Sequence, residues 1–254
     1  TQLQSRELCW ENTAQAEIGL DFGFFKNRLT GEIDYYQKKT TDLLLYRTLP
    51  STSGFTGVWS NVGELENKGL EFAIHSNNFS GSFIWTTDFN MSFNRNKIID
   101  INGPEITPNG INYVIEGEPI GVFKLVKYAG VDPDNGDALY YLGPDNDETT
   151  NNFNLAEPQI VGSPNPDFTG GFNNYFEYMG FDLNALISFV YGNEIYNGAG
   201  IYQSANAAWF DNQTVDQMNR WQKPGDITDV PQARLNENNG VKTTSRYLYD
   251  GSYI

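Results

Sequence analysis

Residues 11–39, ENTAQAEIGLDFGFFKNRLTGEIDYYQKK, alternate between apolar and polar side chains on both sides of a short polar segment at residues 26–28. Side chains of a β-strand point alternately to opposite faces, so this pattern predicts a β-hairpin with one apolar and one polar face. The apolar positions are Ala14, Ala16, Ile18, Leu20, Phe22 and Phe24 in the first arm, and Leu29, Ile33 and Tyr35 in the second. Each arm is about as long as a tilted strand needs to cross a membrane.

Two further stretches repeat this pattern. Residues 68–94 predict a second hairpin with its turn at residues 76–82, and residues 167–192 predict a third that turns at Met179 and Gly180. Long polar stretches without clear alternation, residues 40–63, 95–166 and 193–245, follow the three hairpins and are expected to be mainly loops, with one short hairpin formed by residues 121–129 and 138–142. Short turns that alternate with long excursions are typical of outer-membrane β-barrels, whereas a soluble sandwich spaces its strands more evenly.

The polar faces of these hairpins are rich in carboxylates. They carry Glu17, Asp21, Glu32, Asp34, Glu71 and Asp88. Acidic side chains opposite an apolar face fit a sheet with lipid on one side and water on the other. The phenylalanines nearest the short turns are expected to form an interfacial aromatic girdle, with Phe22, Phe24, Phe83 and Phe181 as its members.

The composition excludes several classes of function. The chain has 254 residues and a formal net charge of -16, with twice as many acids as bases, which argues against binding to nucleic acid. Cys9 is the single cysteine and His75 the single histidine, so neither an internal disulfide nor a zinc cage of cysteines and histidines is possible. No apolar run approaches the roughly 20 residues of a membrane helix.

The candidate metal and catalytic groups are weak. Asp132, Asp134 and Asp137 lie within six residues, but the spacing fails the EF-hand pattern, and a tight turn is favoured over an ion site. Asp145, Asp147 and Glu148 are interpreted as a solvated loop. His75 falls on the polar side of its strand near a short turn, which favours a contact in the barrel interior over a catalytic role. We therefore expect no catalytic residue, no metal and no cofactor.

Aromatic residues in the long loops are the candidate binding residues. Their rings could stack on a substrate or contact a partner protein, or pack the loops together. The candidates for substrate or partner binding are Trp59, Tyr113, Tyr202, Trp209 and Phe210, and Phe55 and Trp221 share the same loop setting.

Short blocks spread over nearly the whole chain resemble the SusC/RagA-like branch of the TonB-dependent outer-membrane transporters. They include WENT at residues 10–13, GLDFGF at 19–24, NRL at 27–29, DYY at 34–36, TDLL at 41–44, NVGE at 61–64, FNRNKI at 93–98, GSPNP at 162–166, FTGG at 168–171, YGN at 191–193 and DGSYI at 250–254. The blocks follow the order that the family has, which makes the resemblance specific.

The resemblance implies an all-β fold, an antiparallel transmembrane β-barrel of 22 strands, of which residues 1–254 are one part. The signal sequence, the plug, earlier strands and the final strands are then expected outside this chain. The resemblance also implies active import of an oligosaccharide or peptide across the cell outer membrane. The implied partners are a SusD-like surface lipoprotein and TonB, which is contacted through the missing N-terminal region.

Two other functions remain as alternatives. The chain could be a secreted, soluble β-sandwich that binds carbohydrate, or, less in keeping with the pattern, a glycan-degrading enzyme. The enzyme would need paired carboxylates, which any chain with 32 acids can offer.

Overall fold

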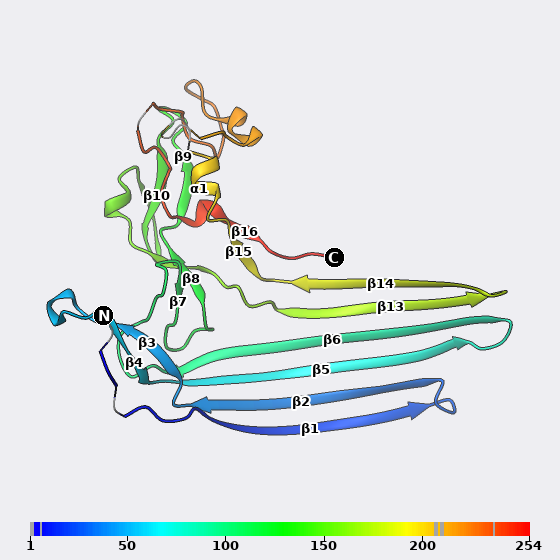
Figure 1. Ribbon diagram of the computed structural model, residues 1–254. Helices are drawn as coiled ribbons and strands as arrows, with labels where there is room; N and C mark the ends of the chain where they lie inside the picture. Colours follow the sequence, from blue (N-terminus) through cyan, green and yellow to red (C-terminus); the bar gives the residue numbers. More distant parts are fainter. Residues whose placement is uncertain (1–2, 6, 206–207, 209–210, 236) are drawn as a thin grey trace.

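The computed structural model describes residues 3–5, 7–205, 208, 211–235 and 237–254. Six long strands form one antiparallel sheet, in the order β1-β2-β5-β6-β13-β14 (Figure 1). These strands are β1 (Asn12–Phe24), β2 (Leu29–Thr41), β5 (Glu64–Phe79), β6 (Phe83–Asp100), β13 (Phe168–Tyr178) and β14 (Phe181–Tyr191). The three predicted hairpins are therefore confirmed, and each one pairs with the next.

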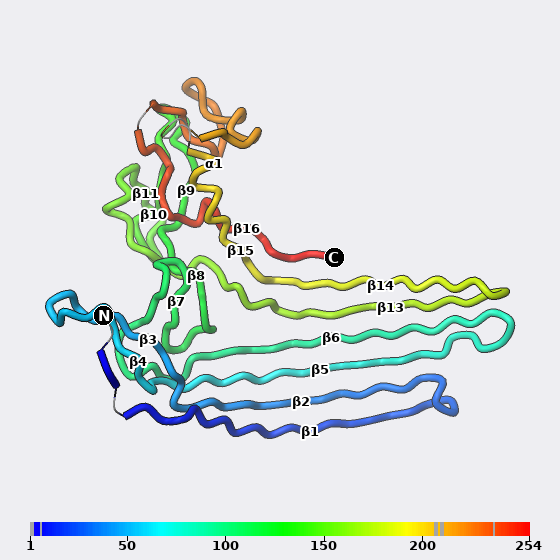
Figure 2. Tube along the Cα trace, in the orientation of Figure 1, coloured from blue at the N-terminus to red at the C-terminus, as the bar shows by residue number. Residues whose placement is uncertain are grey.

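The short turns of all three hairpins lie at one end of the sheet, and the long connections leave from the other end (Figure 2). Phe25, Lys26 and Asn27 take φ values of 55°, 58° and 63° in the first turn. Met179 and Gly180 form the third turn, where φ is 52° and 82°, as the tight connection between the strands requires. The predicted second turn, residues 76–82, is longer than the observed one. β5 continues through a bulge to Phe79 and leaves only residues 80–82 as the turn.

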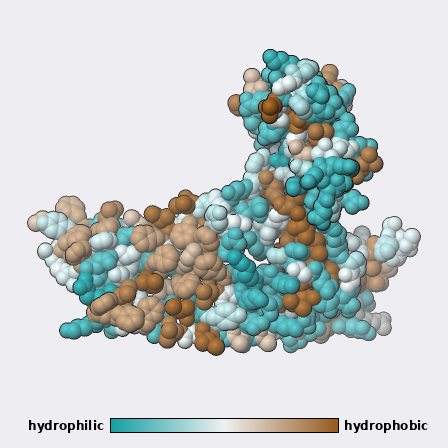
Figure 3. Space-filling view, turned by 180° about the vertical axis from the view of Figure 1, so that it is seen from behind, coloured by the Kyte–Doolittle hydropathy of each residue, from teal (hydrophilic) through white to brown (hydrophobic). Residues whose placement is uncertain are grey.

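The strand register places apolar residues next to apolar residues across the whole sheet. Ile18 lies opposite Tyr35, and Leu20 lies opposite Ile33. The same face continues through the other hairpins, with the pairs Phe72 and Met91, Ile74 and Phe89, Phe89 and Phe172, and Phe172 and Ile187. Brown and tan side chains accordingly gather over the strands in Figure 3.

This apolar face is open rather than covered. Ile18 is 76% exposed and Phe181 is 82% exposed. In a β-sandwich a second sheet would pack about 10 Å above such a face. Among the described residues no second sheet does so, and this open face does not fit the sandwich alternative. Phe22 and Phe24, whose ring centroids are 5.5 Å apart, lie on this face near the short turns, where the girdle was expected.

A glycine lets one aromatic ring cross the polar face. A Cβ atom at Gly69 would lie 2.6 Å from the ring of Tyr36 on the neighbouring strand. The Tyr36 hydroxyl continues over this glycine and donates to Asn94 Oδ1 on β6, at 3.0 Å. The ring thus ties three adjacent strands together, which is a common way to stabilise a glycine within a sheet.

The loops contain more regular structure than their sequence predicted. Residues 40–63, expected to be a loop, include a hairpin of β3 (Leu44–Thr48) and β4 (Gly57–Asn61). The expected pairing of residues 121–129 with 138–142 is correct only in its second half. β9 (Tyr128–Val131) pairs with β10 (Ala138–Gly143), whereas β8 (Val122–Leu125) pairs with β7 (Asn112–Tyr113) and β12 (Gln159–Gly162).

The two long connections, residues 101–167 and 192–252, pack together into a body that we call the loop assembly. Its remaining elements are β11 (Asn146–Thr150), β15 (Glu194–Tyr196), β16 (Leu248–Asp250), α1 (Gly200–Gln203) and the short 3-10 helices Phe153–Leu155, Val215–Asn219 and Ser245–Tyr247; a further 3-10 helix, Ser51–Ser53, lies between β3 and β4. No helix within the described residues is long and apolar enough to cross a membrane.

Most of the buried apolar side chains belong to the loop assembly and few to the long strands. They include Val122, Phe123, Leu125, Val126, Ala138, Tyr140, Trp221, Val230, Val241 and Tyr247. The two connections share this core, since Val126 bridges to Thr244 and the Tyr128 amide donates to Ser245 Oγ at 2.9 Å. The long strands are thus built to face something other than protein, while the loops hold the protein core.

Candidate functional site

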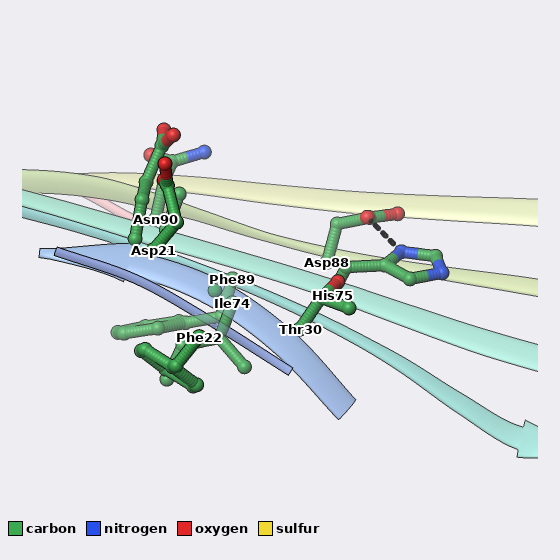
Figure 4. Close-up of a pocket in the computed structure, with 11 residues that line it drawn as sticks. Asp21, Phe22, Thr30, Ile74, His75, Asp88, Phe89 and Asn90 are labelled. Atoms are coloured by element: carbon green, nitrogen blue, oxygen red, sulfur yellow. Dashed lines mark hydrogen bonds and ion pairs between the residues drawn. The ribbon is translucent and has the colours of Figure 1, made fainter. Parts of the chain in front are cut away.

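The polar face of the sheet carries several carboxylates, and some of them lie directly opposite one another on neighbouring strands. We call Glu17, Asp21, Glu32, Asp34, Glu71 and Asp88 the acidic wall. The register sets Asp21 directly opposite Glu32, and Asp34 directly opposite Glu71. Figure 4 shows Asp21 and Asn90 projecting from one side of the sheet, while Phe22 and Ile74 project from the other. The sequence predicted which face these acids share but not that they pair across strands.

The acidic wall has few positive partners. In the described part of the chain, the one basic side chain within 4.0 Å of a wall carboxylate is His75, whose Nδ1 lies 2.6 Å from Asp88 Oδ1. Glu71 accepts a hydrogen bond from Ser92 Oγ at 3.2 Å. Like charges directly opposite each other destabilise a strand pair. Water and its counterions weaken this repulsion, so the wall suits a water-filled interior.

Asparagine side chains connect the wall to the loop assembly at the far end of the strands. Asn94 and Asn96 on β6 both donate to Asn67 Oδ1 on β5, at 3.4 and 2.8 Å. Asn96 Oδ1 in turn accepts the backbone amide of Ile120 at 2.7 Å. These hydrogen bonds fix the position of the loop assembly relative to the end of the sheet.

The candidate aromatic residues lie on different elements of the loops. The Trp59 ring on β4 is 37% exposed and meets Tyr46 edge to face, with centroids 5.3 Å apart. Lys124 Nζ lies 5.6 Å from the centre of the Tyr113 ring on β7. Tyr202 lies on α1 and is 57% exposed. Figure 1 places α1, which carries Tyr202, well away from β4 and β7, so the structure does not gather all three residues at one place.

The other loop aromatics differ in their setting. Trp209 and Phe210 lie outside the described residues. Trp221 is buried, at 6% exposure, and its indole Nε1 donates to the Pro133 carbonyl at 3.0 Å. Because its ring packs inside the loop assembly, Trp221 is a structural residue. Phe55 lies half-buried beside the 3-10 helix Ser51–Ser53.

The acidic segment at residues 132–137 is a turn held by protein groups. Arg234 Nη2 donates to Asp137 Oδ1 at 2.5 Å, and Asn151 Nδ2 donates to Asp137 Oδ2 at 2.7 Å. Asp132 Oδ1 accepts the Asp134 amide at 2.8 Å. Within the described ranges no three acidic, histidine or cysteine side chains cluster as metal ligands do. These contacts favour the interpretation as a turn.

Buried tyrosines and one arginine form the centre of the loop assembly. Burial raises the pKa of Tyr140 to about 12, against an opposing effect of the nearby Arg246 charge. Burial likewise raises the pKa of Tyr128, and Arg246 again opposes it. The Arg246 guanidinium lies 5.8 Å from the centre of the Tyr128 ring and 5.5 Å from that of Tyr247. A cation stacked on aromatic rings in this way stabilises the packing of the loop assembly, and we assign it no catalytic role.

Comparison with known protein families gives this architecture a family. The model described as "TonB dependent receptor-like, beta-barrel" matches residues 4–169. The chain belongs to this family. Its six-stranded sheet is thus a section of an antiparallel transmembrane β-barrel in the cell outer membrane, as predicted. The enzyme alternative is wrong, because the family and the relatives it matches are receptors and transporters.

Individual relatives agree with this assignment. TonB-dependent receptor P3 of Formosa agariphila is 37% identical over 100% of this chain and 27% of the relative. SusC of Bacteroides thetaiotaomicron, a TonB-dependent receptor, is 27% identical over 79% of this chain and 22% of the relative. The chain therefore spans about a quarter of the length of the curated relatives it matches.

Solved structures show the same fold. A chain of the RagAB peptide transporter superposes with a TM-score of 0.86 and 26% identity, over 96% of this receptor section and 28% of that chain. The RagAB peptide importer in its "open-open" state gives a TM-score of 0.83 and 27% identity, over 96% of this receptor section and 27% of that chain.

Proposed function

We propose that this receptor section belongs to an importer that carries an oligosaccharide or a peptide across the outer membrane. One observation supports this proposal above all: a single sheet has a continuous open apolar face on one side and an acidic face on the other. A lipid-facing exterior and a polar interior are what a barrel needs to enclose a pathway for polar solutes. The wider protein supplies transport, and this section supplies part of its wall and its outer loops.

We also propose that residues 1–254 form part of one barrel domain. The edge strands β1 and β14 each pair with a single long strand within the described residues, apart from one bridge between Val190 and Tyr253. Open sheet edges are unstable in a membrane because backbone groups there must be paired. Further strands of the same protein are therefore needed on both sides, consistent with the 22-stranded barrel of the family.

The proposed partners are a SusD-like lipoprotein over the loop assembly and TonB on the opposite side of the membrane. The loop assembly leaves several large apolar side chains exposed, and apolar surface of this kind marks sites of protein contact. They include Leu155, Val215, Met218, Ile227 and Leu235. The related RagAB structures are consistent with such pairing. TonB would act through the N-terminal region that relatives have in addition to this section.

Among the loop aromatics, we propose Trp59, Tyr113 and Tyr202, with Trp209 and Phe210, as contacts for substrate or lid. Tyr202 lies on α1, away from β4 and β7, and this spread suits an extended ligand or a broad protein surface better than a small molecule. Exposed aromatic rings bind both sugars and protein surfaces through their flat apolar faces.

Uptake by whole cells tests the proposal. A strain that lacks the full-length gene should lose growth on either an oligosaccharide or a peptide mixture supplied as the sole carbon source, and the intact gene should restore it. Restoration by a variant with Trp59→Ala and Tyr202→Ala should be weaker, whereas Thr149→Ala, at an exposed position on β11 outside the proposed contact residues, should restore growth as the intact gene does. Equal growth of the deletion and parent strains on both nutrients would refute the import proposal.

A further inference from the structure

A groove of about 490 Å³ opens on the apolar face of the sheet, beside the first two short turns. Phe25 and Leu29 line it on the side of the first hairpin, and Phe79 and Trp85 line it on the side of the second. Arg28 is the single charged residue among its lining residues in the described chain. The groove therefore combines an apolar bed with one fixed cation at its rim.

Hydrogen bonds hold the Arg28 side chain in place. Its Nε donates to the Asn77 carbonyl at 3.2 Å, and its Nη2 donates to the Asn78 carbonyl at 2.6 Å. The Asn77 amide returns a bond of 2.7 Å to the Arg28 carbonyl. Across the described residues, Arg28 has no carboxylate within 4.0 Å, and its Nη1 makes no hydrogen bond. A guanidinium that is positioned in this way keeps its charge and one donor edge for another anion.

Aromatic rings mark the level of the groove in the membrane. The Phe79 and Trp85 rings stack with centroids 5.8 Å apart, and Trp85 stacks on Phe176 at 5.7 Å. Phe83 and Tyr178 continue the row, with centroids 6.4 Å apart. Such rows lie at the boundary between hydrocarbon and headgroups in membrane barrels. Because short turns face the periplasm, this boundary belongs to the inner leaflet.

The charge around the groove differs from that of the chain as a whole. The sequence has a net charge of -16, yet the turn beside the groove carries Lys26 and Arg28. The nearest member of the acidic wall, Asp88, lies opposite His75, the residue before Ser76 of the groove, and it projects with His75 from the other face of the sheet (Figure 4). An anion in the groove would thus meet positive charge and be separated from the carboxylates by the sheet itself.

We propose that this groove is a binding site for one phospholipid of the periplasmic leaflet. Arg28 Nη1 donates to the phosphate diester, which Arg binds better than any other side chain because of its flat fork of donors. Lys26 adds positive charge at the headgroup, where basic residues near a membrane surface attract anionic lipids. An acyl chain lies along Leu29, Phe79 and the apolar face that continues from them toward the membrane centre. The bound lipid bridges the first and second hairpins.

Native mass spectrometry of the full-length transporter in a mild detergent tests this site. Titration with phosphatidylglycerol should show at least one retained lipid on the parent protein, and the Arg28→Gln variant should bind it about tenfold more weakly. Lys97→Gln is the matched control, since Lys97 is an exposed cation at the far end of β6, and it should retain the lipid as the parent does.

A second variant separates lipid binding from support of the turn. Phe79→Ala removes one wall of the groove without removing any group that bonds to Arg28, and it should weaken phosphatidylglycerol binding several-fold. Inorganic phosphate and diacylglycerol, added separately, should each fail to compete for the site, because each has half of the required chemistry. Unchanged lipid binding in both variants would overturn the proposal, and so would full competition by inorganic phosphate alone.

Discussion

Ile18→Lys offers the sharpest test of which face of the sheet meets lipid. Ile18 is 76% exposed and lies at the centre of the 13-residue strand β1, six residues from either end. At about 3.3 Å per residue and a tilt of about 45°, this strand spans roughly 30 Å of membrane. Ile18 therefore lies near the bilayer midplane, where a lipid-facing lysine costs about 2–4 kcal/mol of folding free energy.

The neighbouring change Glu17→Lys is the matched control. Glu17 lies one residue away on the same strand but on the acidic wall, opposite Tyr36. A lysine there faces water and relieves repulsion among carboxylates, so the expected change is within about 0.5 kcal/mol of the parent. The two variants carry the same new side chain at the same depth and differ only in the face they occupy.

Urea titration of the full-length protein refolded into phospholipid vesicles measures both changes. Folded and unfolded fractions can be separated by their electrophoretic mobility without boiling. A loss of about 2–4 kcal/mol for Ile18→Lys, with little change for Glu17→Lys, is the expected result. Equal losses for the two variants, or a larger loss for Glu17→Lys, would refute the assignment of lipid and water to the two faces.

Three further outcomes are expected. Gly69→Val places a side chain where the Tyr36 ring lies, and should lower the unfolding free energy by about 1–3 kcal/mol in the same urea titration. The raised pKa of Tyr140, about 12 against 10.0, means that burial favours the neutral phenol. The contribution of Tyr140 to the stability of the loop assembly is therefore complete below pH 10. It falls by up to about 1.4 kcal/mol per pH unit between pH 10 and about 12, and tyrosinate absorbance during alkaline unfolding would follow this loss. Arg234→Ala removes the contact with Asp137 and should speed amide exchange at residues 132–137, as measured by hydrogen exchange.

The alternating strands could be predicted from sequence because their faces meet different solvents. From Ala14 to Phe24, the residues of β1 alternate between a lipid-facing and a water-facing side. A shift of one residue in the strand register would place Glu17 and Asp21 in lipid. The turn at Met179 and Gly180 was equally clear, since it separates two strands with matching alternation. The second turn was misplaced because Ser76 and Asn77 read as turn residues, although they are paired within β5.

The loop assembly could not be predicted in the same way, because its contacts are between residues far apart in sequence. In the sequence Trp221 looks like any other aromatic residue of a loop. Its buried position involves a contact with Pro133, which lies 88 residues away. Tyr247 stands in a polar stretch, yet it is almost fully buried. Short irregular segments carry no periodic pattern, so their core residues are recognisable only after the chain has folded. The cross-strand pairing of Asp34 with Glu71 depends in the same way on a register that sequence leaves open.

The shared core of the two long connections has a consequence for how such receptors diversify. Val126 pairs with Thr244, the Ala138 amide donates to Asn239 Oδ1, and the Trp221 indole donates to the Pro133 carbonyl, so each connection completes the interior of the other. A graft that replaces one connection alone would leave cavities and unpaired amides in the one that stays. Recombination between relatives should succeed when both connections are exchanged together, while the membrane strands beneath them are kept. The unit of exchange is thus a pair of loops that are separated by a hairpin in the sequence and share one core in the structure.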